Sequence, residues 1–219
     1  MRFPNSFNGS KKIFLAEILA LITSVLMIIG AIVAINSVKA ESGDGFVGSL
    51  VGGGAILLVG GIIAIVAFII QLLGINACAK DEPAFKTALY AILAGIVLGI
   101  ISGATSGAVK EVFSAIGSVA SLCATIFVIK GFINLANQLG RSDVASLGKK
   151  VLYICVALAL VGIVLSIVSA IVTPAEITLD SISSYKTVQV ITIISAIVGI
   201  VEAVIYILFL KKSKDMLAA

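Results

Sequence analysis

The sequence contains no histidine and no tryptophan, and only 12% of its 219 residues are charged. Without histidine there is no histidine general base, no Ser-His or Cys-His catalytic pair and no histidine-liganded zinc. The motifs G-x-x-x-x-G-K-[ST], G-x-S-x-G and H-E-x-x-H, which serve phosphate binding, acyl transfer and metal-dependent hydrolysis, are also absent. We therefore expect a protein that is not an enzyme and that uses no cofactor and no metal.

Cysteine is scarce as well. The three cysteines, Cys78, Cys123 and Cys155, show no C-x-x-C spacing. We interpret them as small, reduced, apolar packing residues. The net charge of +4 does not indicate a nucleic-acid partner, because the basic residues flank apolar segments and form no stripe interleaved with aromatic residues.

The sequence is rich in apolar residues, which make up 60% of the chain and give a mean hydropathy of +1.25. Soluble domains contain about 45–50%, and a membrane-spanning helix needs about 20 mostly apolar residues in a row. The six segments that qualify are 13–36, 47–74, 88–107, 112–134, 151–173 and 188–210. All three prolines lie outside these segments. We expect an all-α, polytopic bundle of six transmembrane helices that forms a single transmembrane domain over residues 1–219.

The basic residues predict the orientation of this bundle. One side of the predicted membrane carries Arg2, Lys11, Lys12, Lys80, Lys86, Arg141, Lys149, Lys150, Lys211, Lys212 and Lys214, and the other side carries Lys39, Lys110 and Lys186. The positive-inside rule then places both termini in the cytoplasm. We expect a bacterial plasma membrane, with the lipid bilayer as the main partner.

The end of the first span, Val38-Lys39-Ala40, resembles a signal-peptidase site. A secretory signal has an apolar region of about 7–15 residues, and the apolar stretch here is longer. We therefore interpret the first span as an uncleaved helix.

The odd-numbered spans begin alike, which suggests three related helix hairpins. The matching segments are Lys11-Lys12-Ile13-Phe14-Leu15, Lys86-Thr87-Ala88-Leu89-Tyr90 and Lys149-Lys150-Val151-Leu152-Tyr153. Any cytoplasmic entry into a span can also read as lysine followed by aliphatic residues, so both interpretations stay open. Repeats that all begin on one side differ from the inverted repeats of many transporters.

Small residues mark the helix faces that we expect to pack. Gly95, Gly99, Gly103 and Gly107 follow one another at four-residue spacing, which makes spans two and three our candidates for a close contact. Small and hydroxyl-bearing residues also share one face of span four (Ser114, Ser118, Ser121, Thr125), span five (Cys155, Ala159, Gly162, Ser166, Ser169, Thr173) and span six (Thr192, Ser195, Gly199, Glu202, Tyr206). These faces either pack together, with hydroxyls bonded to carbonyls one turn earlier, or line a polar cavity.

Four polar side chains, Glu17, Gln71, Lys130 and Glu202, lie within the predicted spans. Glu17 and Gln71 are near the ends of their spans, and the long side chain of Lys130 reaches the interface. Glu202 lies nine residues before Lys211, about 13 Å from that flank and close to the midplane of a roughly 30 Å hydrocarbon core. A carboxylate at this depth is a functional candidate by default.

Two non-enzymatic functions follow. The first is a structural or accessory membrane protein, which associates with itself or with another membrane protein through its glycine- and hydroxyl-rich faces. The alternative is a small proton- or cation-coupled transporter or channel that uses Glu202, with Glu17 as a second carboxylate and Ser166 and Ser195 as neighbours. A continuous cavity that reaches Glu202 would favour the alternative.

Overall fold

The computed structural model describes residues 2–39, 44–172 and 182–218, and within these ranges the chain forms six helices and no strand. The helices are α1 (Pro4–Lys39), α2 (Asp44–Cys78), α3 (Pro83–Ala104), α4 (Gly107–Gln138), α5 (Ser142–Val172) and α6 (Ile182–Ala218). Each contains a stretch that is long and apolar enough to span a membrane. Many Leu, Ile and Val side chains stay exposed along these stretches, for example Leu58 and Ile100, as a helix that faces lipid allows. The all-helical prediction is confirmed.

The helices differ from the predicted spans mainly at the end of the bundle that holds both termini. α1 begins nine residues before the predicted first span, and α6 ends eight residues after the last one. Pro4 and Pro83 are the first residues of α1 and α3, positions where a missing N–H costs no hydrogen bond. Gly140, at φ +70°, follows the end of α4. The segment that resembles a signal-peptidase site ends at Ala40, which lies outside the described ranges together with the next three residues.

The connection between α3 and α4 corrects one predicted boundary. α3 ends at Ala104, because Thr105 is extended (φ −114°, ψ 167°) and its hydroxyl donates to the carbonyl of Ile101 at 3.0 Å. Gly107 is therefore the first residue of α4 and does not belong to a glycine row on α3.

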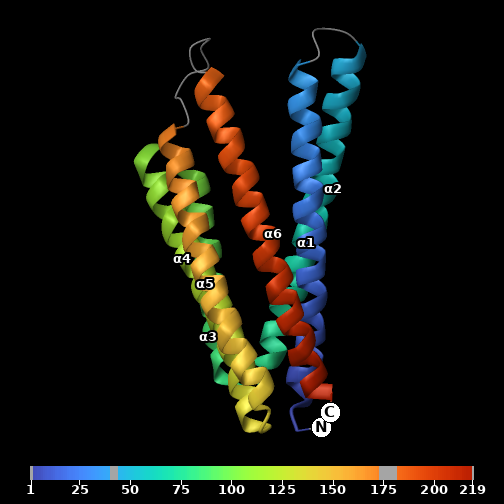
Figure 1. Ribbon diagram of the computed structural model, residues 1–219, viewed down its shortest axis with the longest axis vertical. Coiled ribbons are helices and arrows are strands. Elements are labelled where there is room, and N and C mark those ends of the chain that lie inside the picture. Colours follow the sequence, from blue (N-terminus) through green and yellow to red (C-terminus); the bar gives the residue numbers. More distant parts are fainter. Residues whose placement is uncertain (1, 40–43, 173–181, 219) are drawn as a thin grey trace.

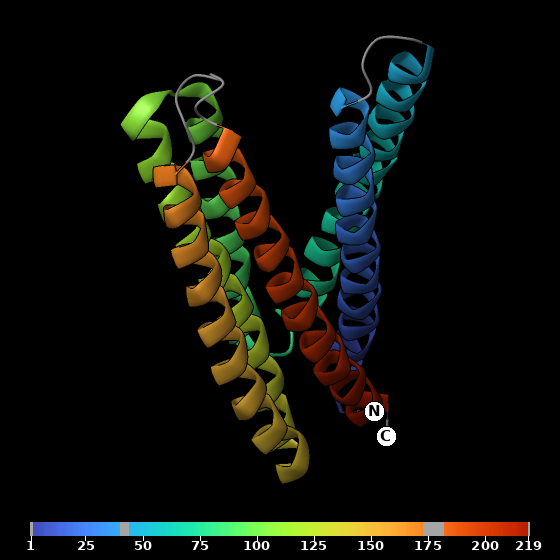
Figure 2. The ribbon, with the colours of Figure 1, turned by 45° about the horizontal axis from the view of Figure 1, so that its top comes forward.

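The helices form two groups, α1 with α2 and α3 with α4 and α5, and α6 runs between them (Figure 1). The groups meet at the end that holds both termini, which we call the terminal end. They separate toward the opposite end, which we call the far end. The largest helix contacts are α1 with α2 and α3 with α4, and α5 packs on α4 and α6. Figure 2 shows that α6 crosses from the α5 side at the far end to the α1 side at the terminal end. The contact of α2 with α3 is small, in contrast to the close contact expected from sequence.

The buried core lies at the terminal end. Three phenylalanine rings meet there edge to face, with centroids 5.0 Å apart for Phe85 and Phe132 and 6.1 Å apart for Phe132 and Phe209. They come from α3, α4 and α6, and none has more than 1% of its surface exposed. Aromatic pairs in this geometry add about 0.5–1.5 kcal/mol beyond the burial of their area. This cluster joins α6 to α3 and α4.

The closest backbone contacts in this region are made by glycines that the sequence pattern did not single out. An added Cβ at Gly74 of α2 would lie 2.8 Å from the carbonyl oxygen of Gly9 in α1, and one at Gly131 would lie 2.6 Å from the ring of Phe85. On α3, an added Cβ at Gly95 would make ordinary contacts with α4, and at Gly99 and Gly103 it would meet no atom within 4 Å. The two latter glycines of the predicted row therefore make no close helix contact in the described chain.

Candidate functional site

A cavity of about 850 Å³ lies between α4, α5 and α6. Its wall contains the hydroxyl-bearing residues of α4, together with Gly162 and Ser166 of α5 and Ser195 and Glu202 of α6. The structure thus brings together three of the four candidate residues, Ser166, Ser195 and Glu202, on the faces that the sequence periodicity indicated. The side chains of Ser169 and Thr173 lie outside the described part of the structure.

The hydroxyl groups of this wall donate to their own helices. Ser118, Ser121 and Ser166 donate to the carbonyl oxygens of Ser114, Gly117 and Gly162 at 3.0–3.1 Å, and Thr125 donates to that of Ser121 at 3.3 Å. A hydroxyl that has used its hydrogen in this way keeps lone pairs as acceptors. The wall can therefore accept hydrogen bonds but offers few donors.

Glu202 is the only ionisable residue in the wall of this cavity, within the part of the chain that the structure describes. Its side chain is half-buried, and it makes no hydrogen bond or ion pair with any other described residue. A carboxylate and several hydroxyl oxygens in an otherwise apolar wall form a site that suits a ligand with positive charge or with hydrogen-bond donors.

Glu17, the fourth candidate residue, lies on α1 and does not line the 850 Å³ cavity. Its Oε1 accepts a hydrogen bond from Gln71 Nε2 of α2 at 2.8 Å. α1 contacts α6, and Glu17 lies close enough to Glu202 for their charges to interact. Two carboxylates inside a membrane repel each other when both are ionised, and a proton or another cation between them removes this repulsion.

A second cavity of about 380 Å³ lies between α2, α3, α4 and α6. Its polar lining residues are Gln71, Ser121, Thr125 and Tyr206, and its apolar wall includes Phe68 and Gly95. Ser121 and Thr125 line both cavities. The two cavities are therefore neighbours, with these two hydroxyl residues of α4 in the walls of both.

Lys130 lines neither cavity. Its side chain is exposed, and its Nζ lies 5.9 Å from the centroid of the Phe127 ring. It therefore brings no positive charge into the wall around Glu202.

The four residues between α2 and α3 form a polar junction to which the sequence analysis gave no role. Asp81 accepts hydrogen bonds from Asn5 Nδ2 at 2.9 Å and from the backbone N–H of Ser6 at 2.7 Å, and so caps the start of α1. Partial burial opposes ionisation of Asp81, but these hydrogen bonds outweigh it and hold the pKa of Asp81 below its ordinary value. A sequence signal existed, because two acidic residues before Pro83 are typical of a helix start.

Glu82, the next residue, is only 6% exposed and connects α3 to α4. It caps α3 through the Ala84 N–H at 3.4 Å, and its carboxylate accepts from Asn134 Nδ2 at 2.9 Å and from Gln138 Nε2 at 3.1 Å. Nothing in the spacing of these residues along the chain indicated that they meet. Together, Asp81 and Glu82 tie both groups of helices to one short connection.

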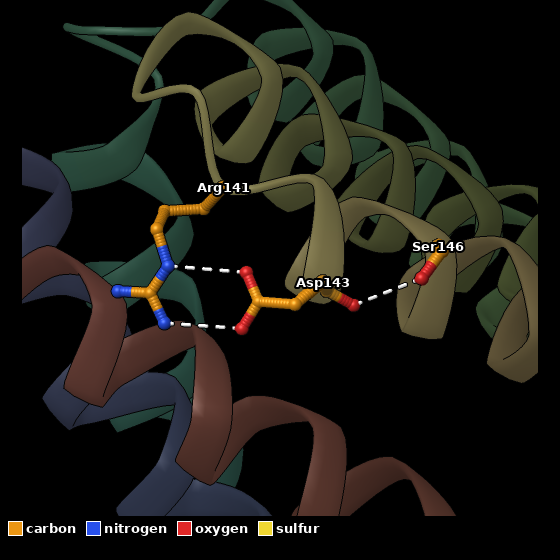
Figure 3. Close-up of polar contacts among 3 residues, drawn as sticks. All are labelled: Arg141, Asp143 and Ser146. Carbon is orange, nitrogen blue, oxygen red and sulfur yellow. Dashed lines mark hydrogen bonds and ion pairs between the residues drawn. The ribbon is translucent and has the colours of Figure 1, made fainter.

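The exposed ion pair at the start of α5 has a different character (Figure 3). Arg141 Nε and Nη2 each lie 3.1 Å from an oxygen of Asp143, and the Ser146 hydroxyl donates to the carbonyl of Asp143 at 3.0 Å. Both charged side chains are about half exposed, so the pair contributes little to stability.

The described residues contain no group of three or more His, Cys, Asp or Glu side chains that could hold a metal ion, and their three cysteines are free. Comparison with known protein families, curated proteins and solved structures finds no match. The class that the fold defines is a six-helix protein compatible with an integral membrane location.

Proposed function

We propose that the protein is a non-catalytic integral membrane protein that binds a proton or a cation in the 850 Å³ cavity and moves it across the bilayer. Glu202 is the ionisable residue of this site, and Ser166 and Ser195 line the same cavity. The observation that carries the proposal is that the cavity between α4, α5 and α6 reaches this carboxylate. A cavity at Glu202 is the feature expected of a transporter and not of an accessory protein.

The chemistry of the wall favours a positive ligand. The hydroxyl groups with assigned bonds use their hydrogens within their own helices, and Lys130 lies elsewhere. An anion would face an uncompensated carboxylate in surroundings of low dielectric, where such repulsion is strong. A cation would instead offset the charge of an ionised Glu202, and the hydroxyl oxygens would accept its hydrogen bonds or coordinate it.

The packing supports access to the cavity from the far end. At the terminal end the helices are closed by the Phe85, Phe132 and Phe209 cluster, whereas the cavity wall extends to Val112 and Ser114, near the start of α4 at the far end. The excess of basic residues at the terminal end supports the proposal that both termini are cytoplasmic. In a bacterial plasma membrane, the cavity would then be reached from outside the cell.

Flux measurements on reconstituted protein test this function. Proteoliposomes that hold a pH-sensitive dye report proton movement, and uptake of radioactive rubidium reports movement of a monovalent cation. We expect Glu202→Gln to lose the flux and its pH dependence, and Asp215→Asn, the same chemical change at an exposed position near the C-terminus, to keep both. Flux at the wild-type rate in Glu202→Gln contradicts the proposal, and so does a wild type that moves neither protons, nor rubidium, nor a small organic cation such as N-ethylpyridinium.

A structural or accessory role is the second candidate, and the open glycine faces favour it. An added Cβ at Gly99 or Gly103 of α3 would meet no atom within 4 Å, which leaves room for a helix of another copy of this chain. Energy transfer between labelled copies in lipid vesicles tests this role. We expect Gly99→Leu to reduce the transfer if copies pack through this face, and unchanged transfer contradicts it.

A further inference from the structure

The 380 Å³ cavity has the features of a binding site in its own right. Tyr206 of α6 lines it and is only 7% exposed, yet its hydroxyl has no hydrogen-bond partner within residues 2–39, 44–172 and 182–218. The Tyr206 hydroxyl is not among the fully buried oxygens that lack a partner, so it is open to the cavity and can bond a ligand there. The cavity volume also lies within the roughly 300–1,000 Å³ range of small-molecule sites.

We infer that this smaller cavity is an inner subsite for the transported ligand, and that the ligand is an organic cation with an apolar body. The inference rests on the proposed function, because it takes the cation from the cavity at Glu202 and gives it a second resting position nearer the terminal end. The inner subsite also restricts the proposed substrates to cations that an apolar, aromatic wall can bind.

The walls of the inner cavity suit such a cation. Phe68 of α2 and Tyr206 of α6 both line it, and aromatic ring faces attract organic cations with about 0.5–2 kcal/mol each. Gln71 donates its Nε2 hydrogen to Glu17, so its Oε1 remains an acceptor with a carboxylate directly behind the amide. The remaining wall is aliphatic, including Ile92, and would cover the apolar body.

The two cavities lie next to each other. Ser121 and Thr125 line both, and their hydroxyl hydrogens are bonded to their own helix, which leaves acceptor oxygens along the passage. Glu202 and Tyr206 lie four residues apart on α6 and so share a face, one in each cavity. A cation that moves from Glu202 to the Tyr206 ring would meet the acceptor oxygens of Ser121 and Thr125.

A fluorescence experiment can observe the inner subsite alone. Because the chain has no tryptophan, Phe68→Trp introduces a single indole into the wall of the inner cavity. The probe is N-ethylpyridinium, a small organic cation that quenches indole fluorescence on contact. Phe68 is partly exposed, so this substitution leaves the core intact. We expect saturable quenching in detergent-purified protein.

A matched pair of glycine substitutions makes the test specific. Gly95 lines the inner cavity and Gly99, one turn further along α3, does not. Added to Phe68→Trp, Gly95→Leu fills the cavity, and we expect at least a tenfold loss of affinity in the quenching curve. Gly99→Leu should leave the curve unchanged, which also shows that a bulky residue on α3 is tolerated.

The results distinguish the inner subsite from the proposed transport function. Non-saturable quenching, or equal quenching in the Gly95→Leu and Gly99→Leu variants, overturns the inner subsite, while Glu202-dependent flux of protons or rubidium would leave the transport proposal standing. Saturable quenching that Gly95→Leu removes, in a protein whose flux depends on Glu202, supports both.

Discussion

Gln71 Nε2 donates a hydrogen bond to Glu17 Oε1 at 2.8 Å and so joins α2 to α1 inside the predicted membrane region. The amide belongs to the wall of the inner cavity, whereas the carboxylate lies behind it and within electrostatic range of Glu202. This bond therefore holds the two polar groups of the α1–α2 hairpin near the polar groups of α4 and α6.

Removing one partner of this pair should cost more than removing both. Gln71→Leu leaves the half-buried Glu17 carboxylate without its donor, and we expect a loss of about 1–3 kcal/mol in unfolding free energy. The double variant Gln71→Leu, Glu17→Met replaces both polar groups with apolar ones and should regain most of that loss. Thermal unfolding in detergent measures the cycle, and additive effects of the two substitutions would show that the bond is not formed.

Gly74 should be among the least tolerant glycines. In Gly74→Ala, the added Cβ would lie 2.8 Å from the Gly9 carbonyl oxygen and 2.9 Å from the Ile13 nitrogen, both in the backbone of α1. We expect α1 and α2 to be forced apart at a cost of about 1–3 kcal/mol, read as a lower midpoint of thermal unfolding. The matched control is Gly99→Ala, which adds the same methyl group into open space. An equal effect of the two substitutions would contradict the described contact.

Asp81 should make stability depend on pH in a defined direction. The pKa of Asp81 in the folded state lies below the ordinary value of 3.8. Its contribution to the unfolding free energy is therefore complete above pH 3.8 and is lost as the pH falls through the lowered pKa. We expect Asp81→Asn to cost about 1 kcal/mol at pH 7, as the loss of a helix cap does, and to converge with the wild type at strongly acidic pH. Unfolding at pH 7 and at pH 3 measures this.

The control for Asp81 is Asp143→Asn, because Asp143 belongs to the exposed pair of Figure 3. We expect a change of less than about 0.5 kcal/mol there. A difference between wild type and Asp81→Asn that grows on acidification would contradict the assigned role of Asp81.

Two substitutions of Glu82 should lower the unfolding free energy by different amounts. Glu82→Ala leaves the amides of Asn134 and Gln138 without their buried acceptor, and we expect a loss of about 2–3 kcal/mol in unfolding free energy. Glu82→Gln keeps one acceptor oxygen in place and should lose about half as much. Chemical unfolding in mixed detergent measures both, and equal stability of the two variants would rule out the amide contacts as the cause.

The parts of the fold that depend on local patterns could be predicted. Long apolar runs located all six helices, and the periodic hydroxyl residues correctly marked the faces of α4, α5 and α6 that meet around one cavity. Side-chain periodicity indicates which residues share a face of one helix. In these three helices it was sufficient to identify the faces that line the cavity.

The choice of helix partners could not be predicted in the same way. Four-residue spacing turns about 40° further around a helix at each step, so the row from Gly95 to Gly103 drifts away from a single neighbour. The close contacts are made instead at Gly9 and Gly74, which no repeated spacing distinguishes. The junction at Glu82 likewise depends on Asn134, more than fifty residues away in the chain.

Cation protection of Glu202 against dicyclohexylcarbodiimide tests the central claim most directly. This apolar reagent modifies protonated carboxyl groups within membranes, and mass spectrometry of the digested protein locates the modified residue. We predict that Glu202 is modified, and that N-ethylpyridinium or rubidium suppresses the modification in a saturable way, because each would occupy the cavity beside the carboxylate. Modification of Glu202 that neither cation changes would contradict the claim that this carboxylate is a cation site.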